Sequence, residues 1–247
     1  MAINYALWYL RKVLKSSMKK IKIIAEIGHN GNGNMRLNKL MIEEAKICGA
    51  DVVKFQLYDT DKIKKNWQSR YMELKFAELT KDDLRELKDH ADKIGIEFMA
   101  SAFDSERVRW LEEIGVKCHK LASRSVNDTE LINAMEDTGK PIIVSLGMWK
   151  DQEFPKIKNA QFLYCVAEYP AYISDLPSFE RYAGFSDHTI GCYWAYEAIK
   201  RGATVIEKHF TLSKELPGFN QKGSAEPREL KDLCVYARQH ERGVIAQ

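Results

Sequence analysis

Short apolar segments alternate with helical patterns along almost the whole chain, from residue 21 onward. The apolar segments are rich in Val, Ile and Phe, and a few of them contain a charged residue such as Glu26 or Lys54. Segments of this length and composition are typical of parallel strands that are buried on both faces. The predicted strands are Ile21–Ile27, Asp51–Leu57, Glu97–Phe103, Cys118–Ala122, Pro141–Leu146, Gln161–Val166, Ala183–Ser186 and Thr204–Phe210.

Helical periodicity fills most of the gaps between these strands. Apolar residues at positions 37, 40, 41, 45 and 48 follow the helical repeat. Thr80, with Asp83 three residues later, is a helix-start signature, and glycines such as Gly49 and Gly95 follow helix ends. The predicted helices are Leu37–Cys48, Lys81–Ile94, Glu106–Ile114, Asp128–Thr138, Tyr193–Arg201 and Glu229–Gln239.

Eight strand–helix alternations in about 220 residues fit a closed (β/α)8 TIM barrel, whose usual size is about 250 residues. The alternative is an open, doubly wound sheet. Such a sheet would be expected to have a glycine-rich phosphate loop after its first strand, but Gly28–Gly33 does not match G-x-G-x-x-G. The fifth and sixth helical units are expected to be shortened, with one or two helical turns each within Phe154–Lys158 and Asp175–Tyr182. We therefore predict one barrel domain over residues 21–247.

Residues 1–20 are interpreted as an N-terminal extension. A short apolar start precedes five basic residues between positions 11 and 20. A signal peptide has the opposite order, with its charge ahead of its apolar core. The segment is interpreted as an appended helix or a disordered arm, with a basic amphipathic helix at a membrane surface as the alternative. A natural start at Met18 is a third interpretation.

Composition narrows the class of protein. The 247 residues include 38 Lys and Arg against 35 Asp and Glu, so the formal net charge of +3 argues against a nucleic-acid binder. The five cysteines are widely spaced, without a C-x-x-C pair, and most lie in apolar segments. Reduced core thiols in a cytoplasmic protein are therefore expected. No apolar run approaches the roughly 20 residues of a transmembrane helix.

Two histidines follow the last two predicted strands. His188 comes after Ser186-Asp187, and His209 comes after Glu207-Lys208. If these strands are parallel neighbours, both imidazoles lie at the same edge of the sheet. Either histidine alone is typical of a core residue bonded to backbone, but the pair also suits a divalent ion such as Mn, Fe, Co or Zn.

Other polar residues end the remaining strands, where a barrel collects its active site. A ring of lysines, hydroxyl groups and two histidines suits a metal together with a phosphorylated or carboxylated small substrate. Besides the two histidines, the ring comprises Glu26, His29, Asn30, Asn32, Lys54, Gln56, Ser101, Asp104, Lys120, Ser123, Arg124, Ser125, Ser145, Glu168, Tyr169, Asp187, Glu207 and Lys208.

Several members of this ring also have a purely structural interpretation. A lysine inside an apolar strand, such as Lys54 or Lys120, is costly unless it forms an ion pair or binds an anion. The serines at positions 101, 123 and 145 either cap the helices that follow or bond phosphate oxygens. Glu26 is either a partner in an ion pair or a general acid or base.

Nine ordered motifs between Ile21 and Arg238 resemble the N-acetylneuraminate (sialic acid) synthase family. The SDHT and IEKHFT pair is the most specific of them. The motifs are IIAEIG with NG in Ile23–Gly33, GADVVKFQ at Gly49–Gln56, GIEFMASAFD at Gly95–Asp104, KLAS at Lys120–Ser123, PIIVSLGM at Pro141–Met148, YCVAEYP at Tyr164–Pro170, GFSDHTIG at Gly184–Gly191, GATVIEKHFTL at Gly202–Leu212 and SAEPREL at Ser224–Leu230.

The resemblance implies a role for each matching residue. It implies that phosphoenolpyruvate condenses with an N-acetylated hexose, N-acetylmannosamine by default, to a nine-carbon sugar acid, and it allows a homodimer. The expected cofactor is a divalent metal, Mn2+ first, with Mg2+ or Co2+ as alternatives. The implied metal ligands are His188 and His209, the catalytic residues are Glu26, Lys54 and Lys120, and the substrate-binding residues are Gln56, Ser101, Ser123, Ser145, Tyr169 and Asn220.

The sequence departs from the family pattern at the sugar end. A family histidine becomes Gly31, a usual Asn or Ser becomes Ala167, and the family's Gly-Pro-Asp becomes Gly218-Phe219-Asn220. The resemblance covers the catalytic barrel and not the family's C-terminal antifreeze-like domain, which supplies an arginine to the sugar. The alternatives are a barrel that binds metal or ligand without condensation, a subunit whose cap is a separate protein, and a related metal-dependent lyase.

Overall fold

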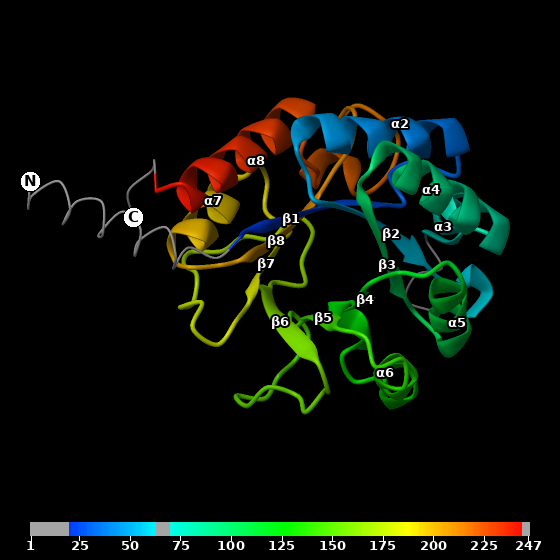
Figure 1. The fold of residues 1–247 in the computed structure, drawn as a ribbon, viewed down its shortest axis with the longest axis horizontal. Coiled ribbons are helices and arrows are strands. Elements are labelled where there is room, and N and C mark those ends of the chain that lie inside the picture. The colour runs from blue at the N-terminus through cyan, green and yellow to red at the C-terminus, as the bar shows by residue number, and fades with distance from the viewer. Residues whose placement is uncertain (1–19, 63–69, 244–247) are drawn as a thin grey trace, which may run out of the picture.

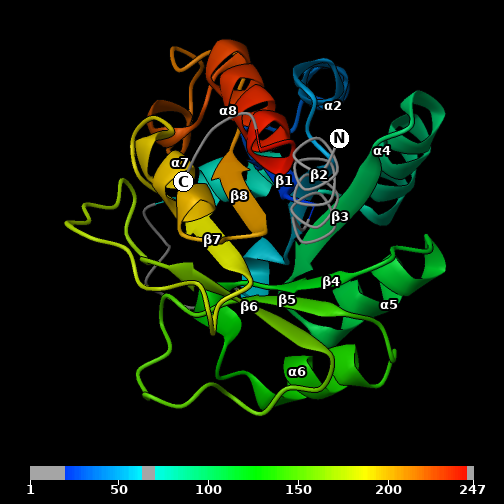
Figure 2. The same cartoon turned by 60° about the vertical axis from the view of Figure 1, so that its left-hand side comes forward.

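The computed structural model describes residues 20–62 and 70–243 and shows a closed barrel of eight parallel strands (Figures 1 and 2). Each strand pairs with the next in the sequence, and β8 pairs with β1. The TIM-barrel prediction is therefore confirmed, and the open-sheet alternative is wrong. The strands are β1 (Lys22–Gly28), β2 (Val52–Leu57), β3 (Glu97–Ala102), β4 (His119–Leu121), β5 (Ile142–Ser145), β6 (Ala160–Cys165), β7 (Gly184–Asp187) and β8 (Val205–His209).

All six predicted helices are present, with ends shifted by a few residues. Thr80 forms the expected capping box with Asp83, and Gly95 takes the left-handed conformation at the other end of that helix. Helix α3 was not predicted. The helices are α2 (Met35–Cys48), α3 (Tyr71–Ala77), α4 (Lys81–Ile94), α5 (Ser105–Glu113), α6 (Thr129–Glu136), α7 (Tyr193–Lys200) and α8 (Pro227–Glu241), with short 3-10 turns η1 (Thr60–Lys62), η3 (Ser123–Ser125) and η4 (Gln221–Gly223).

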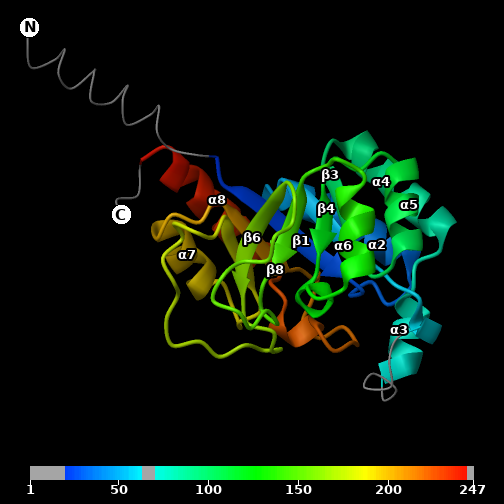
Figure 3. The same ribbon diagram turned by 90° about the horizontal axis from the view of Figure 1, so that it is seen from below.

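The units after β5 and β6 are shortened even further than expected. Residues 146–159 and 166–183 contain no helix in the part of the chain that the structure describes. The helical turns predicted within 154–158 and 175–182 are therefore wrong. Figure 3 shows the contrast between the side of the barrel covered by α4, α5 and α6 and the irregular chain beside β6. Aromatic packing replaces a helix there, because Phe154 lies against Phe162 and Tyr182 with ring centroids 5.0 and 4.9 Å apart.

The two faces of each strand carry different residues. Outward side chains such as Ile23, Val53 and Phe55 pack under the helices in the main hydrophobic core. Inward side chains at the amino-terminal end of the barrel form a second apolar cluster, which contains Ile24, Val52, Met99, Cys118, Ile143, Leu163 and Val205. Side chains alternate between the faces of a strand, so the next inward position on each strand lies one layer closer to the carboxyl ends.

That next layer is polar. Parallel pairing places Glu26 beside Lys54 on one side and beside His209 on the other, and it places Ser101 beside Lys120. The barrel therefore contains two stacked layers of inward side chains. The layer at the amino-terminal end is apolar, and the layer above it is rich in charged and hydroxyl groups. The layer consists of Glu26, Lys54, Ser101, Lys120, Ser145, Cys165, Ser186 and Glu207, all buried.

The remaining expectations concern cysteines and the chain ends. All five cysteines are unpaired and buried, as predicted. The extension predicted at residues 1–20 lies outside the described residues except for Lys20, which forms an ion pair with Asp51 at 3.0 Å. Within residues 20–62 and 70–243, the structure contains no helix that combines the length and apolarity needed to span a membrane.

Candidate active site

A cavity of about 380 Å³ opens at the carboxyl ends of the strands. Every residue to which the family resemblance gave a role lines it, including the two histidines, the two lysines and the three serines. The predicted residues that line the cavity are Glu26, Lys54, Gln56, Ser101, Lys120, Ser123, Ser145, Tyr169, His188, His209 and Asn220. The fold thus brings together side chains from the ends of all eight strands and from the loop after β8.

Lys54 lies between two buried carboxylates at the floor of this cavity. Its Nζ atom is 2.7 Å from Glu26 Oε2 and 3.5 Å from Glu207 Oε1. Lys120 Nζ is 3.9 Å from the same Glu207 oxygen. The ion-pair interpretation of the strand lysines is therefore confirmed. The closest of these contacts is that between Lys54 and Glu26, and Lys120 is the more distant of the two lysines from Glu207.

The four charged groups respond differently to burial. Burial raises the pKa of Glu26, and the Glu207 charge adds to the effect while Lys54 opposes it. Burial also disfavours ionisation of Glu207, but Lys120 and Lys54 hold the pKa of Glu207 below its usual value. Burial disfavours charge on both lysines; Glu207 and Glu26 overcome this at Lys54, whose pKa is raised, whereas the pKa of Lys120 stays lowered.

The three serines are not helix caps. Asp104 and Asp128 accept the capping hydrogen bonds of α5 and α6, so the capping interpretation is wrong. Ser101 Oγ instead accepts from Lys54 Nζ at 3.1 Å, and Ser145 Oγ accepts from Lys120 Nζ at 2.8 Å. Ser123 Oγ accepts from the Gly147 backbone N–H at 2.9 Å. Each serine thus sits where a cation or backbone donor is also present.

Gln56 orients the carboxyl group of Glu26. Its Nε2 donates to Glu26 Oε1 at 2.7 Å, so the two Glu26 oxygens contact Gln56 and Lys54 respectively. Gly28 ends β1 in the left-handed conformation at φ 59°, and a Cβ there would lie 3.1 Å from Glu26 Oε1. The backbone turn therefore favours glycine, and a Cβ there would press on the Glu26–Gln56 pair.

His188 and His209 lie beside each other, with ring centroids 5.8 Å apart. His188 Nδ1 is 2.8 Å from the Val166 carbonyl oxygen and must donate to it, which leaves a lone pair on Nε2. Burial lowers the pKa of His188 to about 4 and the pKa of His209 well below its usual value, so both rings are neutral at pH 7.

This arrangement fits a divalent ion held by two imidazoles. His209 Nδ1 is buried and has no hydrogen-bond partner among the described residues. Within the same part of the chain, no group of three His, Cys, Asp or Glu side chains is placed to hold a metal. An ion at this site would therefore take its remaining ligands from substrate or water. The Tyr169 hydroxyl, 2.9 Å from His188 Nε2, would have to leave that nitrogen first.

Other members of the predicted ring have structural roles. Lys208 and Asp187 are fully buried outside the barrel lumen and form an ion pair of 3.1 Å. Lys208 also donates to the Thr189 carbonyl, which ties the loop that carries His188 to β8. Asn30 Nδ2 donates to the Phe210 carbonyl at 2.8 Å, and this bond joins the loops after β1 and β8.

The cavity also contains residues that the sequence did not single out. Tyr58, Arg70, Cys165 and Phe219 line it, and His29 and Arg124 contribute although they had no assigned role. Tyr58 and Cys165 were not singled out because they lie in or beside apolar strand segments. Arg70 was missed because it directly precedes helix α3, which was not predicted. The one available signal was Phe219, which replaces a proline of the family pattern.

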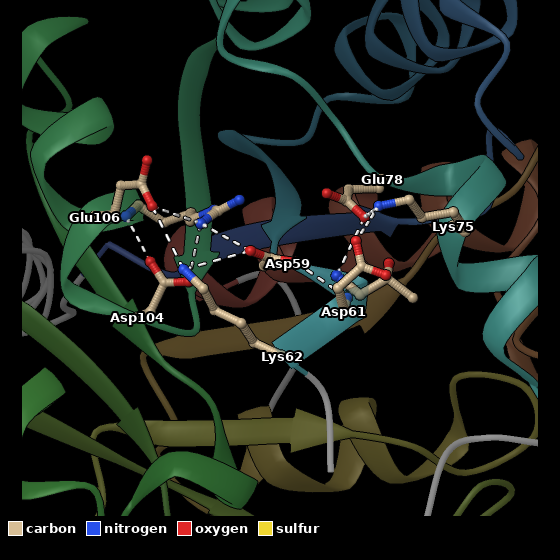
Figure 4. Close-up of polar contacts among 9 residues, drawn as sticks. Asp59, Asp61, Lys62, Lys75, Glu78, Asp104 and Glu106 are labelled. Carbon is tan, nitrogen blue, oxygen red and sulfur yellow. Dashed lines mark hydrogen bonds and ion pairs between the residues drawn. The ribbon is translucent and has the colours of Figure 1, made fainter. Parts of the chain in front are cut away.

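Charged side chains connect the described residues that follow β2 with helices α5 and α3 (Figure 4). Lys62 Nζ lies 3.4 Å from Asp59 Oδ2 and 3.6 Å from Glu106 Oε2, the latter in helix α5. On the other side, Lys75 of α3 forms a 2.9 Å ion pair with Asp61. These contacts hold residues 59–62, which follow Tyr58, against α5 and α3.

Arg107→Leu is expected to lower the free energy of unfolding by about 2 kcal/mol. Arg107 is 5% exposed and lies 3.1, 3.0 and 3.8 Å from carboxylate oxygens of Asp104, Glu106 and Asp59, which would lose their shared cation. Thermal denaturation of the variant, with the exposed Arg85→Leu as control, measures the effect. Equal melting temperatures for the two variants would contradict the assigned role.

Comparison with known proteins gives a consistent result. The sequence model of the NeuB family matches residues 41–244. The chain is 36% identical to N,N'-diacetyllegionaminic acid synthase of Campylobacter jejuni, over 90% of this chain and 77% of that protein. It is 33% identical to human N-acetylneuraminate-9-phosphate synthase, over 90% of this chain and 70% of that protein. A sialic acid synthetase structure from Leptospira borgpetersenii superimposes with a TM-score of 0.84 at 32% identity, covering 92% of this chain and 86% of that one.

Proposed function

The chain belongs to the NeuB family, and on that premise we propose that it condenses phosphoenolpyruvate with an N-acetylated hexose. The products are a nonulosonic acid and inorganic phosphate. One observation carries the proposal: two buried lysines with their serine partners and two neutral imidazoles line the same cavity. The lysines suit an anionic phosphate and carboxylate, and the imidazoles suit a divalent metal.

Phosphoenolpyruvate would bind at the floor of the cavity. Lys120 Nζ and Ser145 Oγ lie 2.8 Å apart, and Lys54 Nζ and Ser101 Oγ lie 3.1 Å apart, so each lysine presents a neighbouring hydroxyl to the same anion. The pKa of Lys120 is lowered because its charge is desolvated with one distant carboxylate partner. An incoming anion would offset that cost, and charge-assisted hydrogen bonds are the stronger kind.

We propose His188 and His209 as the ligands of the divalent ion, Mn2+ first. When bound, such an ion supplies Lewis-acid polarisation of the acceptor's aldehyde oxygen. The protein's own contribution is to hold both rings neutral and to fix His188 through its Nδ1 bond to the Val166 carbonyl.

Glu26 would act as a general acid or base close to the carbon atoms that react. A new bond forms between the alkene carbon of phosphoenolpyruvate and the aldehyde carbon, water adds to the adjacent carbon, and phosphate leaves with its bridging oxygen. Burial raises the pKa of Glu26, which favours its protonated form more than in water. Gln56 and Lys54 fix its two oxygens, so the proton is exchanged at a defined position.

N-acetylmannosamine is the default acceptor. Tyr169 and Asn220 line the same cavity and are the proposed contacts of the sugar. The similar proteins carry names that differ in the sugar acid and in whether it is phosphorylated, so they support the reaction class and leave the acceptor open.

Purified protein is expected to release phosphate from phosphoenolpyruvate when Mn2+ and a suitable N-acetylated hexose are both present. Mass spectrometry should show a product that contains the hexose and the three carbons of phosphoenolpyruvate without its phosphate. Omission of the sugar, and chelation of the metal, are the controls. Absence of phosphate release with every aldose tested, together with absence of metal binding, would refute the proposal.

A further inference from the structure

The backbones of the two proposed metal ligands are held in different ways. His209 is the last residue of β8 and pairs in parallel register with Glu26 of β1. His188 comes directly after the end of β7, because the ladder between β7 and β8 ends at the pair of Asp187 with Lys208. The register of the barrel therefore fixes His209, whereas the position of His188 depends on contacts beyond the sheet.

The side chains of the last ladder pair supply several of these contacts. Lys208 Nζ is 3.1 Å from Asp187 Oδ2 and also donates to the Thr189 carbonyl, so one cation contacts the residues on both sides of His188. Asp187 Oδ1 accepts from the Thr189 N–H at 2.8 Å and from the Thr189 hydroxyl at 2.7 Å. A carboxylate bonded to the N–H two residues later closes a tight turn, and His188 is the central residue of that turn.

This network lies behind the imidazoles and not among them. Ser186 and Glu207 line the cavity, and side chains alternate along a strand, so Asp187 and Lys208 point away from the lumen. Asp187, Lys208 and Thr189 are all buried, so water does not compete for their bonds. The network can therefore act on a bound ion only through the placement of the histidine that the turn carries.

The loop after β6 completes the support of His188. The Ala171 N–H donates to the His188 carbonyl at 2.9 Å, and the Val166 carbonyl accepts from His188 Nδ1 at 2.8 Å. The second bond needs the ring at a defined height above β7, which the turn sets. The backbone and the ring of His188 are thus held by two separate loops, and the turn closed by Lys208 and Asp187 joins them to β8.

A fully buried ion pair needs an explanation other than stability. Both side chains of the Asp187–Lys208 pair are 0% exposed, and removal of two charges from water offsets most of their mutual attraction. Replacement of such a pair by neutral side chains of similar size is often without cost. The bonds to Thr189 instead give the pair a geometric role, because they fix the backbone around His188.

We propose that Asp187 and Lys208 are positioning residues that hold His188 in register with His209, so that both imidazoles can ligate one divalent ion. This inference rests on the proposed function, because it concerns the same two ligands. Partners that orient a metal ligand typically change the metal affinity by about 10- to 100-fold when they are lost. The protein's part is mechanical: the pair touches neither substrate nor ion.

The double variant Asp187→Asn/Lys208→Met tests the proposal. It removes one charge of each sign, so no buried charge is left without a partner, and Asn can still accept from the Thr189 N–H. The variant should melt within about 5 °C of wild type. Calorimetric titration should show Mn2+ binding weakened by about 10- to 100-fold, with unchanged affinity of the metal-free protein for phosphoenolpyruvate.

Nitrogen NMR of the histidine side chains gives a readout that needs no metal. The His188 signals of the metal-free double variant should shift, because the bond from Nδ1 to the Val166 carbonyl is loosened, while the His209 signals stay in place. Thr189→Val removes only the hydroxyl bond to Asp187 and should show smaller changes in the same direction. This second variant carries the test if the double variant does not fold.

Asp51→Asn/Arg238→Met is the matched control. It removes an ion pair that joins the start of β2 to α8 at the opposite end of the barrel, and it should leave Mn2+ affinity and both sets of histidine signals unchanged. Unchanged Mn2+ affinity in the folded Asp187→Asn/Lys208→Met variant would overturn the inference, as would an equal loss in the control. If wild type binds no Mn2+, the proposed metal site is refuted, and unchanged His188 signals would then separately overturn the positioning role.

Discussion

Lys120→Met is expected to abolish condensation without weakening the fold, whereas Lys54→Met is expected to weaken both. Each lysine lies beside a serine hydroxyl at the floor of the cavity, so each substitution removes a charge-assisted contact to phosphoenolpyruvate. Loss of such a contact in a buried site should lower kcat/KM for phosphoenolpyruvate by about 10³-fold or more.

The stabilities should differ because the two pKa values shift in opposite directions. The pKa of Lys120 is lowered by burial, so its charge costs free energy in the folded state, and a neutral Met removes that cost. The pKa of Lys54 is raised, since Glu207 and Glu26 outweigh burial. Removal of Lys54 leaves two buried carboxylates near each other and should cost about 3 kcal/mol.

The same shifts give opposite pH dependences. A lysine with a raised folded-state pKa contributes stability that is complete below its unfolded pKa of about 10.4 and is lost as pH rises through the folded value. The advantage of wild type over Lys54→Met should therefore shrink at high pH. The destabilising effect of Lys120 is complete below its lowered folded-state pKa and disappears as pH rises to about 10.4.

Chemical denaturation from pH 7 to above about pH 10.4, together with steady-state kinetics, measures both effects. Lys200→Met on α7 is the control, because Lys200 is a surface residue whose ion pair with Glu197 is solvent-exposed. It should change neither quantity appreciably. A destabilised Lys120→Met protein, or a Lys54→Met protein as stable as wild type, would show that the charge balance assigned to the floor is wrong.

The barrel could be predicted from the sequence because its signals are local and repeated. Buried parallel strands read as apolar runs, and the glycines that end helices take positive φ, as Gly49, Gly115 and Gly202 do. The same regularity placed the site, since a charged residue inside an apolar strand is costly to bury unless it has a charged partner or a ligand. Glu26 and Lys54 were found in this way, and the parallel register brings them together.

The parts that could not be predicted depend on contacts between distant segments. Helix α3 has seven residues and is held by ion pairs such as that of Lys75 with Asp61. The hydrophobic periodicity of the sequence does not predict ion pairs of this kind. Residues 146–159 and 166–183, which follow β5 and β6, pack through Phe154 and Tyr182. These two segments contain no helix in the described residues. Arg70 belongs to the site through stacking on Phe219, almost 150 residues away in the sequence.

His209→Asn and His188→Asn are each expected to reduce Mn2+ affinity by about 100-fold or more, and kcat by about 10³-fold. Two imidazoles are the proposed protein ligands, so loss of one leaves a single donor. His209 Nδ1 has no other hydrogen-bond partner among the described residues, and the pKa values of both histidines are lowered chiefly by burial. Neither ring therefore contributes a positive charge to the stability of the folded protein, and the metal-free variants should fold with near-wild-type stability.

Calorimetric titration with Mn2+ and the shift of melting temperature on Mn2+ addition distinguish a ligand from a structural histidine. Wild type should gain stability as the ratio of free Mn2+ to its dissociation constant rises, and both variants should lose that gain. His90→Asn is the matched control, since His90 lies on α4 and pairs with Glu43 at 2.9 Å, away from the cavity. Tyr169→Phe should bind Mn2+ more tightly than wild type, because it removes the hydroxyl that occupies His188 Nε2. Unchanged Mn2+ binding in both histidine variants would place the metal elsewhere or exclude it from this site.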